Sequence, residues 1–263
     1  MIRLPLLALA LGTMVSSAEA ASPLRIGVDC TYPPFGYQDS DGQIKGFDVD
    51  VAKLVADRIG REALVLCQDW DGMIPALLAG KFDMISASMS ITEERQKSID
   101  FSVPYRSSSA RFAGQEGLKA HPLNADGSID PEGLDGLTVG IQRASTYAKF
   151  MTEKYPTVSV VEYDKVNDMI LDLEAGRLDL VFAGPIKLDN DFLSKPEGKG
   201  FAFVGPEIND VSYFGPGIGL GLRKEDTALT EAVNNALTAS FADGSFDAMS
   251  GKYWDFRVRP DGQ

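Results

Sequence analysis

Several polar and aromatic side chains fall at positions where an α/β protein binds small charged molecules. Asp29 follows a short apolar segment that is predicted to be a strand, and Tyr32 and Trp70 stand just past the ends of two such strands. The two rings could enclose a flat or cationic group, at roughly 0.5–2 kcal/mol for each cation–π contact. Asp29 could accept hydrogen bonds from the same group. The alternative for each residue is core packing or the capping of a turn.

A second candidate group lies in the segment SMSITEER, residues 88–95, directly after the predicted strand MISA. This order of strand, polar loop and helix places the hydroxyls of Ser88 and Ser90, with backbone N–H groups, at a helix N-terminus that suits an anion. Arg95 could hold a carboxylate with two parallel hydrogen bonds. The alternative is an ordinary capped helix in which Arg95 contacts a neighbouring glutamate or solvent.

The residue types of the chain give little support for a catalytic site or a metal site. His121 is the only histidine, and it lies in a loop-like segment, so Ser-His-Asp and Cys-His arrangements are not expected. Two cysteines and one histidine do not make a zinc site. The stretch GIGLGL, residues 217–222, lacks the order of a nucleotide-binding motif and begins no helix. We therefore expect a binding protein without metal or cofactor, and not an enzyme.

The elements that must position these residues follow a pattern that occurs twice. The first copy, DGMIPALLAGKFDMISA, begins at Asp71, and the second, NDMILDLEAGRLDLVFA, begins at Asn167. Each reads as a helix that ends at a glycine and is followed at once by a buried strand. Two similar units of this size predict two similar lobes, with the ligand site in the crevice between them.

Each copy completes a β-α-β-α-β unit, which predicts a parallel sheet flanked by helices. Residues 114–136 are rich in Gly, Asp and Pro and are interpreted as a surface excursion. The strands expected outside the two copies are residues 24–28, 64–66, 137–141, 158–161, 201–204 and 215–222, and the helices expected there span residues 46–59, 146–155 and 227–241.

The net charge limits the partners that the chain can have, and the N-terminal segment indicates its compartment. The formal net charge is −13, which argues against nucleic acid or an anionic membrane as a partner. Arg3, an apolar run over residues 4–15 and the sequence Ala18-Glu19-Ala20 together form a signal-peptide pattern. We expect residues 1–20 to be removed and residues 21–263 to be exported as a soluble chain.

The two cysteines fit an oxidising compartment. Cys30 and Cys67 each end a predicted strand. If those strands are neighbours in a parallel sheet, the sulfur atoms meet at its edge. A disulfide between them would stabilise the fold by roughly 3–4 kcal/mol, and two free buried thiols are the alternative.

The chain resembles the periplasmic solute-binding proteins of polar amino acid ABC transporters, in particular the histidine-, lysine/arginine/ornithine- and opine-binding branches. The resemblance covers nearly all of the predicted mature chain in order. It is carried by the segments RIGVDCTYPPF, GFDVDVAKLVADRIG, DGMIPALLAGKFDMI, SITEERQ, YFGPGIGLGLRKED and ADGSFDAMSGKYWDF.

The resemblance implies an α/β, two-lobed periplasmic binding protein fold of type II, in which each lobe is a mainly parallel sheet flanked by helices and two hinge strands join the lobes. Residues 21–107 with 217–263 would form the first lobe, and residues 108–216 the second. The implied chain is a periplasmic monomer that delivers its small-molecule ligand to an inner-membrane ABC permease. The ligand-binding residues implied, beside those named above, are Gln142, Thr146 and Gly184.

The resemblance also assigns roles to these side chains. Arg95, with Ser88 and Ser90, would hold the α-carboxylate of the ligand, and Thr146 of the second lobe would add a hydrogen bond. Asp29 would bind the distal cation of the ligand, flanked by the rings of Tyr32 and Trp70.

Two positions depart from the family pattern. Gly184 stands where the basic amino acid binders carry an aspartate for the α-ammonium group, and Ala87 replaces the first serine of the family's loop. Gly184 would leave space for an opine, whose α-nitrogen carries a carboxyalkyl arm, while Asp189 or Asp191 could replace the missing carboxylate. The ligand therefore stays open between a cationic amino acid and an arginine-derived opine. A same-fold enzyme of the cyclohexadienyl dehydratase kind is the alternative function.

Overall fold

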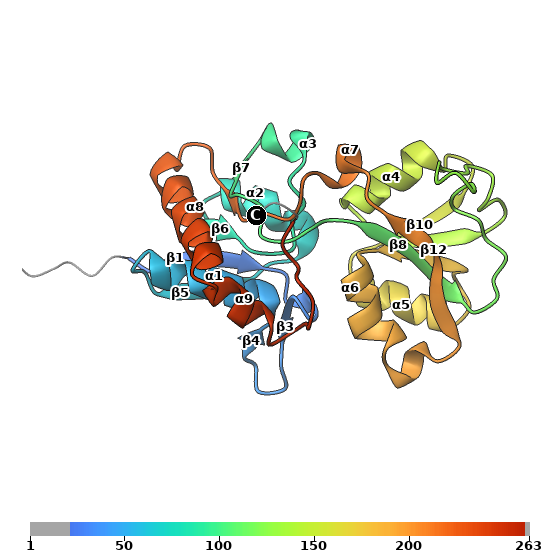
Figure 1. The fold of residues 1–263 in the computed structure, drawn as a ribbon, viewed down its shortest axis with the longest axis horizontal. Coiled ribbons are helices and arrows are strands. Elements are labelled where there is room, and N and C mark those ends of the chain that lie inside the picture. Colours follow the sequence, from blue (N-terminus) through green and yellow to red (C-terminus); the bar gives the residue numbers. More distant parts are fainter. Residues whose placement is uncertain (1–21, 261–263) are drawn as a thin grey trace, which may run out of the picture.

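The computed structural model describes residues 22–260, which form two sheet-rich lobes that lie side by side (Figure 1). Each lobe contains one five-stranded sheet. The predicted signal peptide, residues 1–20, lies outside the described residues. Within the described part of the chain, no helix is long and apolar enough to cross a membrane.

The first lobe is built on a sheet with the strand order β5-β1-β6-β13-β7. Strand β1 is parallel to β5 and β6, whereas β13 is antiparallel to β6 and β7. Helices α1, α8 and α9 pack against one another on this lobe (Figure 1). The strands are β1 (Leu24–Val28), β5 (Ala63–Cys67), β6 (Met84–Ile85), β7 (Asp100–Phe101) and β13 (Gly221–Leu222), and the helices are α1 (Phe47–Arg58), α2 (Met73–Leu78), α3 (Glu93–Gln96), α8 (Thr227–Ala242) and α9 (Ser245–Ser250). A small sheet of β2 (Thr31–Tyr32), β3 (Gly36–Gln38) and β4 (Ile44–Lys45) and a 3-10 turn, Trp70–Gly72, complete the lobe.

The second lobe repeats this plan with the strand order β10-β9-β11-β8-β12. Strands β9, β10 and β11 are parallel, and β8 is the antiparallel member between β11 and β12. The strands are β8 (Ala110–Gln115), β9 (Thr138–Gln142), β10 (Ser159–Tyr163), β11 (Leu180–Ala183) and β12 (Phe201–Ile208), and the helices are α4 (Thr146–Lys154), α5 (Val166–Glu174) and α6 (Pro185–Leu188), followed by a π-helical turn, Asp189–Leu193, and a 3-10 turn, Pro196–Gly198.

The repeated sequence pattern forms the same structure in both lobes. Each copy is a helix (α2 or α5) followed by the central strand (β6 or β11) of its sheet. Asp83 accepts a hydrogen bond from the backbone N–H of Arg25 at 3.1 Å, and Asp179 accepts one from the backbone N–H of Thr138 at 2.8 Å. The matched aspartates thus fix the start of the neighbouring strand in each sheet. The matched apolar residues Met73, Leu77, Met169 and Leu173 are all buried in their cores.

Two segments cross between the lobes, residues 102–109 and 209–220. They are paired antiparallel at one point, because the N–H of Ile218 donates to the carbonyl of Arg106 at 2.7 Å and the N–H of Tyr105 donates to the carbonyl of Ile218 at 2.9 Å. The prediction of a continuous strand over residues 215–222 was wrong: only Gly221–Leu222 is a strand, and the second crossing begins with a short helix, α7 (Val211–Phe214). The positive φ angles of Gly215 and Gly217 interrupt extended backbone there.

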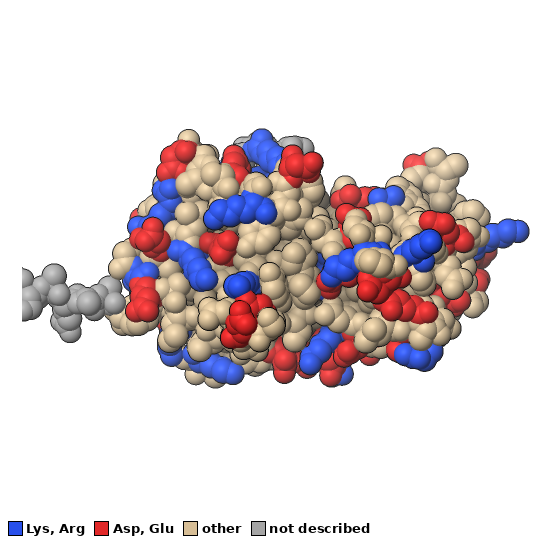
Figure 2. Space-filling view, turned by 90° about the horizontal axis from the view of Figure 1, so that it is seen from below, with Lys and Arg blue, Asp and Glu red and all other residues tan. Residues whose placement is uncertain are grey.

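Acidic and basic side chains are interspersed over the face drawn in Figure 2, with no single basic patch on that face.

Candidate ligand-binding site

The side chains singled out in the sequence lie together between the two lobes. A small pocket of about 30 Å³ adjoins a larger chamber of about 330 Å³ on the side of the crossing segments. The first lobe lines the pocket with Asp29, Tyr32, Trp70, Ala87, Ser88, Ser90 and Arg95, and the second lobe lines it with Gln142, Ser145, Thr146 and Tyr147. Gly184 lines the chamber, and Tyr32, Ser88 and Tyr147 line both spaces.

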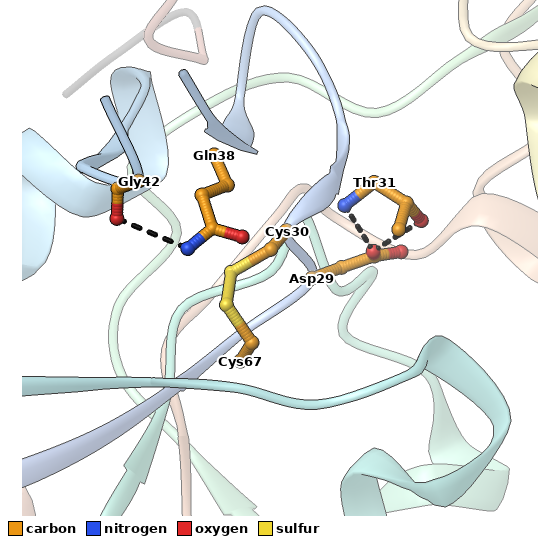
Figure 3. Close-up of a disulfide and its surroundings, with 6 residues drawn as sticks. All are labelled: Asp29, Cys30, Thr31, Gln38, Gly42 and Cys67. Carbon is orange, nitrogen blue, oxygen red and sulfur yellow. Dashed lines mark hydrogen bonds between the residues drawn. A yellow bond between two sulfur atoms is a disulfide. The ribbon is translucent and has the colours of Figure 1, made fainter. Parts of the chain in front are cut away.

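Asp29 is the acidic end of the pocket. It follows β1, is 4 % exposed, and one carboxylate oxygen accepts from the N–H and the hydroxyl of Thr31 at 2.9 and 2.7 Å (Figure 3). Loss of water around the carboxylate raises its pKa, and the two bonds from Thr31 oppose this rise. The second oxygen remains to accept from a ligand cation.

A disulfide stands directly beside this carboxylate. Cys67 pairs in register with Val28 on the neighbouring parallel strand, which brings it to Cys30, with a Cα–Cα distance of 5.4 Å (Figure 3). The bond ties the ends of β1 and β5 and thereby holds the segment that carries Asp29.

Arg95 is the basic end of the pocket. It lies in the short helix α3, whose first turn is capped by Thr92, and its Nη1 donates to the carbonyl of Ser90 at 3.0 Å. Its Nη2 reaches the carbonyl of Ala144 in the second lobe at 3.5 Å. Removal from water lowers the pKa of Arg95 to about 10, so the guanidinium is charged at neutral pH and keeps donors for an anion.

Trp70 and Tyr32 differ in what they contact. The Arg95 guanidinium lies over the Trp70 ring, 5.2 Å from its centroid, so Trp70 orients the basic end of the pocket, in addition to lining it. Tyr32 packs against apolar cores of both lobes, and the Nζ of Lys187 from the second lobe lies 5.1 Å from its ring centroid. Both rings line the small pocket, and their place around a ligand cation stays a prediction.

Ser88 is held in a network behind the pocket. Its hydroxyl donates to the carboxylate of Asp48 at 2.7 Å and accepts from Nη2 of Arg106 at 2.9 Å. The hydroxyl of Tyr105 donates to the same carboxylate at 2.8 Å. The proton of Ser88 is thus committed to Asp48, so the direct contact with a ligand carboxylate implied by the resemblance is not available in this arrangement. Ser90, whose hydroxyl lies 3.0 Å from that of Ser108, remains a candidate donor.

The second lobe presents the start of α4 to the pocket. Ser145 caps the helix by accepting from the N–H of Ala148 at 3.2 Å, and Thr146 and Tyr147 form its first turn. Gln142 is buried and its amide donates to the carbonyl of Asp164 at 3.2 Å.

One residue of the pocket, and one whose carbonyl Arg95 contacts, have an unusual backbone. Ser88 in the first lobe and Ala144 in the second have positive φ angles of 50° and 52°. Such conformations cost of order 1–3 kcal/mol for a residue other than glycine and cluster at functional sites.

Gly184 lines the chamber of about 330 Å³, so the space that its lack of a side chain predicts stays a prediction. A Cβ built there would stand 3.1 Å from the hydroxyl of Tyr147 and 3.9 Å from that of Tyr32. Neither suggested replacement for the missing carboxylate lies in the small pocket. Asp191 is paired with Lys187 and Lys195, both at 2.5 Å, and Asp189 lines the exposed side of the chamber.

The lobes are in contact around the pocket. Besides Tyr32 and Lys187, side-chain ion pairs bridge Lys149 to Glu94 at 3.6 Å and Arg143 to Asp71 at 3.9 Å. Residues of both lobes therefore surround the same space.

The sequence reasoning missed several residues of this region, among them Ser145, Tyr147, Arg106 and Lys187. Ser145 had a local signal, because a serine before an expected helix is a typical N-cap. Arg106, Tyr147 and Lys187 have no local signal, since their positions depend on how the first crossing segment, α4 and α6 pack around the cleft.

A two-lobed α/β chain with a charged pocket between its lobes has the architecture of a solute-binding protein. The chain matches the model of the bacterial extracellular solute-binding proteins, family 3, over residues 24–256, and it belongs to this family. It is 40% identical over 254 residues to the L-arginine-binding protein of Pseudomonas aeruginosa, with 95% of each chain covered. It is 37% identical over 262 residues to the lysine/arginine/ornithine-binding periplasmic protein of Escherichia coli, with 96% of this chain and 98% of the relative covered.

Among solved structures, a periplasmic binding protein of Salmonella typhimurium described as having high arginine specificity superposes with a TM-score of 0.79 at 30% identity, covering 88% of this chain and 99% of that one. The type II periplasmic binding protein fold implied by the sequence is thereby confirmed. These relatives are binding proteins, so the chain is a solute-binding protein and not an enzyme of the dehydratase kind.

Proposed function

We propose that this protein captures arginine, or a closely similar cationic amino acid, between its lobes and delivers it to an ABC importer. The observation that carries the proposal is the pairing of a buried carboxylate, Asp29, with a charged guanidinium, Arg95, in one pocket lined by both lobes. A ligand with a carboxylate at one end and a cation at the other is complementary to this arrangement. The names of the relatives give arginine, lysine and ornithine as ligands of those proteins.

The charges account for part of the affinity. Micromolar to nanomolar binding requires about −8 to −12 kcal/mol, and each hydrogen bond to a charged group contributes roughly 1.5–3 kcal/mol. Two bonds at Arg95 and one or two at Asp29 sum to roughly 4.5–12 kcal/mol before the loss of ligand freedom is subtracted, so burial of the apolar stem of the ligand contributes the rest. Closure follows because the ligand contacts both lobes only when they meet.

We further propose the compartment, the oligomeric state, the partner and the lobe boundaries of the protein. We place the protein in the periplasm as a monomer after removal of residues 1–20, with an inner-membrane permease as its partner. The lobes are assigned as residues 21–107 with 217–263, and 108–216.

Calorimetry on ligand-stripped protein tests the proposal. Arginine, lysine and ornithine should bind, whereas citrulline, which is neutral at its distal end, should bind at least tenfold more weakly. Arg95→Ala should weaken arginine binding about 100-fold or more by removing two charge-assisted bonds. Arg177→Ala is the matched control, because Arg177 is 61% exposed and paired with Asp172 on the second lobe, where it lines none of the pockets described. No heat from any cationic amino acid, or equal affinity in both variants, would contradict the proposal.

A further inference from the structure

Asp48 is a buried acid that stands behind the proposed arginine site. It lies in the first turn of α1, is 1% exposed and lines neither the pocket nor the chamber. One carboxylate oxygen accepts from the hydroxyl of Ser88 at 2.7 Å, and the other accepts from the hydroxyl of Tyr105 at 2.8 Å. Burial raises the pKa of Asp48, and the charge of Arg106 and these two bonds oppose the rise.

The loop of residues 86–90, which Asp48 contacts, contains a strained residue. Ser88 has a φ angle of 50°, in the left-handed region, which a residue other than glycine keeps only where its surroundings enforce it. Ala87, Ser88 and Ser90 of this loop line the small pocket. The carbonyl of Ser90 accepts from Nη1 of Arg95 at 3.0 Å. A change of Ser88 to an ordinary φ angle would therefore redirect the chain at both neighbours and displace a hydrogen-bond partner of the Arg95 guanidinium.

Two bonds to Asp48 fix the loop at and just before the strained residue. The hydroxyl of Ser86 donates to the backbone carbonyl of Asp48 at 2.7 Å, and the hydroxyl of Ser88 donates to its carboxylate. Nη2 of Arg106 adds a bond to the Ser88 hydroxyl at 2.9 Å, but a guanidinium only donates, so it cannot accept the Ser88 proton. The acceptor that fixes the Ser88 side chain is therefore the carboxylate of Asp48.

The same loop is joined to both segments that cross between the lobes. Arg106 belongs to the first crossing, and on the second crossing the N–H of Gly219 donates to the carbonyl of Met89 at 3.1 Å. The hydroxyl oxygen of Ser90, at the end of the loop, lies 3.0 Å from that of Ser108 on the first crossing. The conformation of this loop thus decides how the pocket wall meets the segments that connect the lobes.

We propose that Asp48 is a positioning residue for ligand binding, whose carboxylate holds Ser88 in the left-handed conformation that shapes the pocket wall. This inference rests on the proposed function and adds to it a residue that does not line the ligand space. A loop that is fixed before the ligand arrives need not be ordered during binding, and such preorganisation raises affinity. Asp48 therefore acts on arginine affinity through the backbone of Ser88.

Calorimetry with arginine on two substitutions of Ser88 tests the proposal. Ser88→Ala removes the bond to Asp48 but keeps a residue for which a φ angle of 50° is unfavourable, and it should weaken arginine binding about 10-fold. Ser88→Gly removes the same bond, but glycine adopts this φ angle readily, so the affinity should stay within about threefold of that of the wild-type protein. A loss as large for glycine as for alanine would overturn the proposal, because the ligand would then depend on the Ser88 hydroxyl itself.

Asp48→Ala tests the same link from the other side. It should weaken arginine binding about 10-fold in the wild-type protein, but less than about threefold in the Ser88→Gly variant, where the backbone no longer needs the carboxylate. Tyr105→Phe is the matched control, because it removes the other bond to Asp48 and leaves the bond from Ser88. This control should lower the thermal midpoint and keep the arginine affinity within about twofold.

Three further results would overturn the positioning role while the wild-type protein still binds arginine. They are an unchanged affinity in Ser88→Ala, an equal loss from Asp48→Ala with and without Ser88→Gly, and a loss in Tyr105→Phe as large as that in Asp48→Ala. If Asp48→Ala does not fold, the comparison of the two Ser88 variants decides the question alone. No binding of arginine by the wild-type protein would instead overturn the proposed function.

Discussion

Replacing Asp29 by asparagine tests the charge selectivity of the pocket most directly. Asparagine has nearly the same shape and keeps an oxygen that accepts from the N–H and hydroxyl of Thr31, so the turn after β1 should be preserved. The substitution removes one negative charge that is 4 % exposed. At a separation of about 4 Å and an effective dielectric constant of about 20, a pair of unit charges gains about 4 kcal/mol.

The loss of water around both charges offsets part of this gain, and we expect a net loss of about 2–3 kcal/mol for arginine. This corresponds to a 30- to 150-fold weaker affinity. Citrulline, which has a neutral group at the same end, should change by less than about threefold. Isothermal titration of both ligands against both proteins measures the difference, and Asp57→Asn, an exposed acid on α1, is the control. An equal loss for arginine and citrulline, or no loss for arginine, would refute the assignment of Asp29 to the ligand cation.

Asp29 should also make the stability of the ligand-free protein and its arginine affinity depend on pH. The pKa of Asp29 is raised above 3.8 by burial, so the folded protein binds this proton more tightly than the unfolded chain. The charged carboxylate therefore destabilises the ligand-free fold at neutral pH, and this cost disappears as the pH falls through the raised pKa. Asp29→Asn should raise the thermal midpoint of the ligand-free protein at pH 7 while it weakens arginine binding. Arginine affinity of the wild-type protein should fall over the same acidic range.

Three further predictions concern stability. Replacing Cys30 and Cys67 by serine, which opens a loop of 37 residues, should lower the free energy of unfolding by about 4 kcal/mol in chemical denaturation, and an unchanged midpoint would contradict this. The pKa of Asp83, which accepts bonds from Arg25 and Arg223, is lowered to about 2, so it stabilises the fold above pH 4 and this contribution is lost as the pH falls toward 2. Asp83→Asn should therefore lower the free energy of unfolding by about 2 kcal/mol at pH 7. In acid denaturation curves the difference from the wild-type protein should become smaller as the pH falls. Lys187→Met removes a fully buried partner of Asp191 and should destabilise the protein by about 2 kcal/mol in thermal unfolding. Lys195→Met, at a side chain that is 47% exposed, should change the stability little.

The sequence by itself determined the elements and much of the site. The period of apolar residues and the glycines after helices located β1, α8 and the two copies of the helix–strand unit, because these features depend on neighbours in the chain. Asp29, Tyr32 and Trp70 could be identified because residues at the carboxyl ends of parallel strands face the same edge of a sheet. Arg95 could be identified because it belongs to a helix that directly follows a strand.

Only the tertiary structure decided how these side chains are used. Ser88 donates to Asp48, 40 residues away, and Arg106 reaches the cleft because its crossing segment pairs with Ile218. Tyr147 occupies the place beside Gly184, although these residues lie on different elements of the second lobe. Such contacts join residues far apart in the sequence, and their distances are set by the packing of the two lobes, which local patterns do not encode.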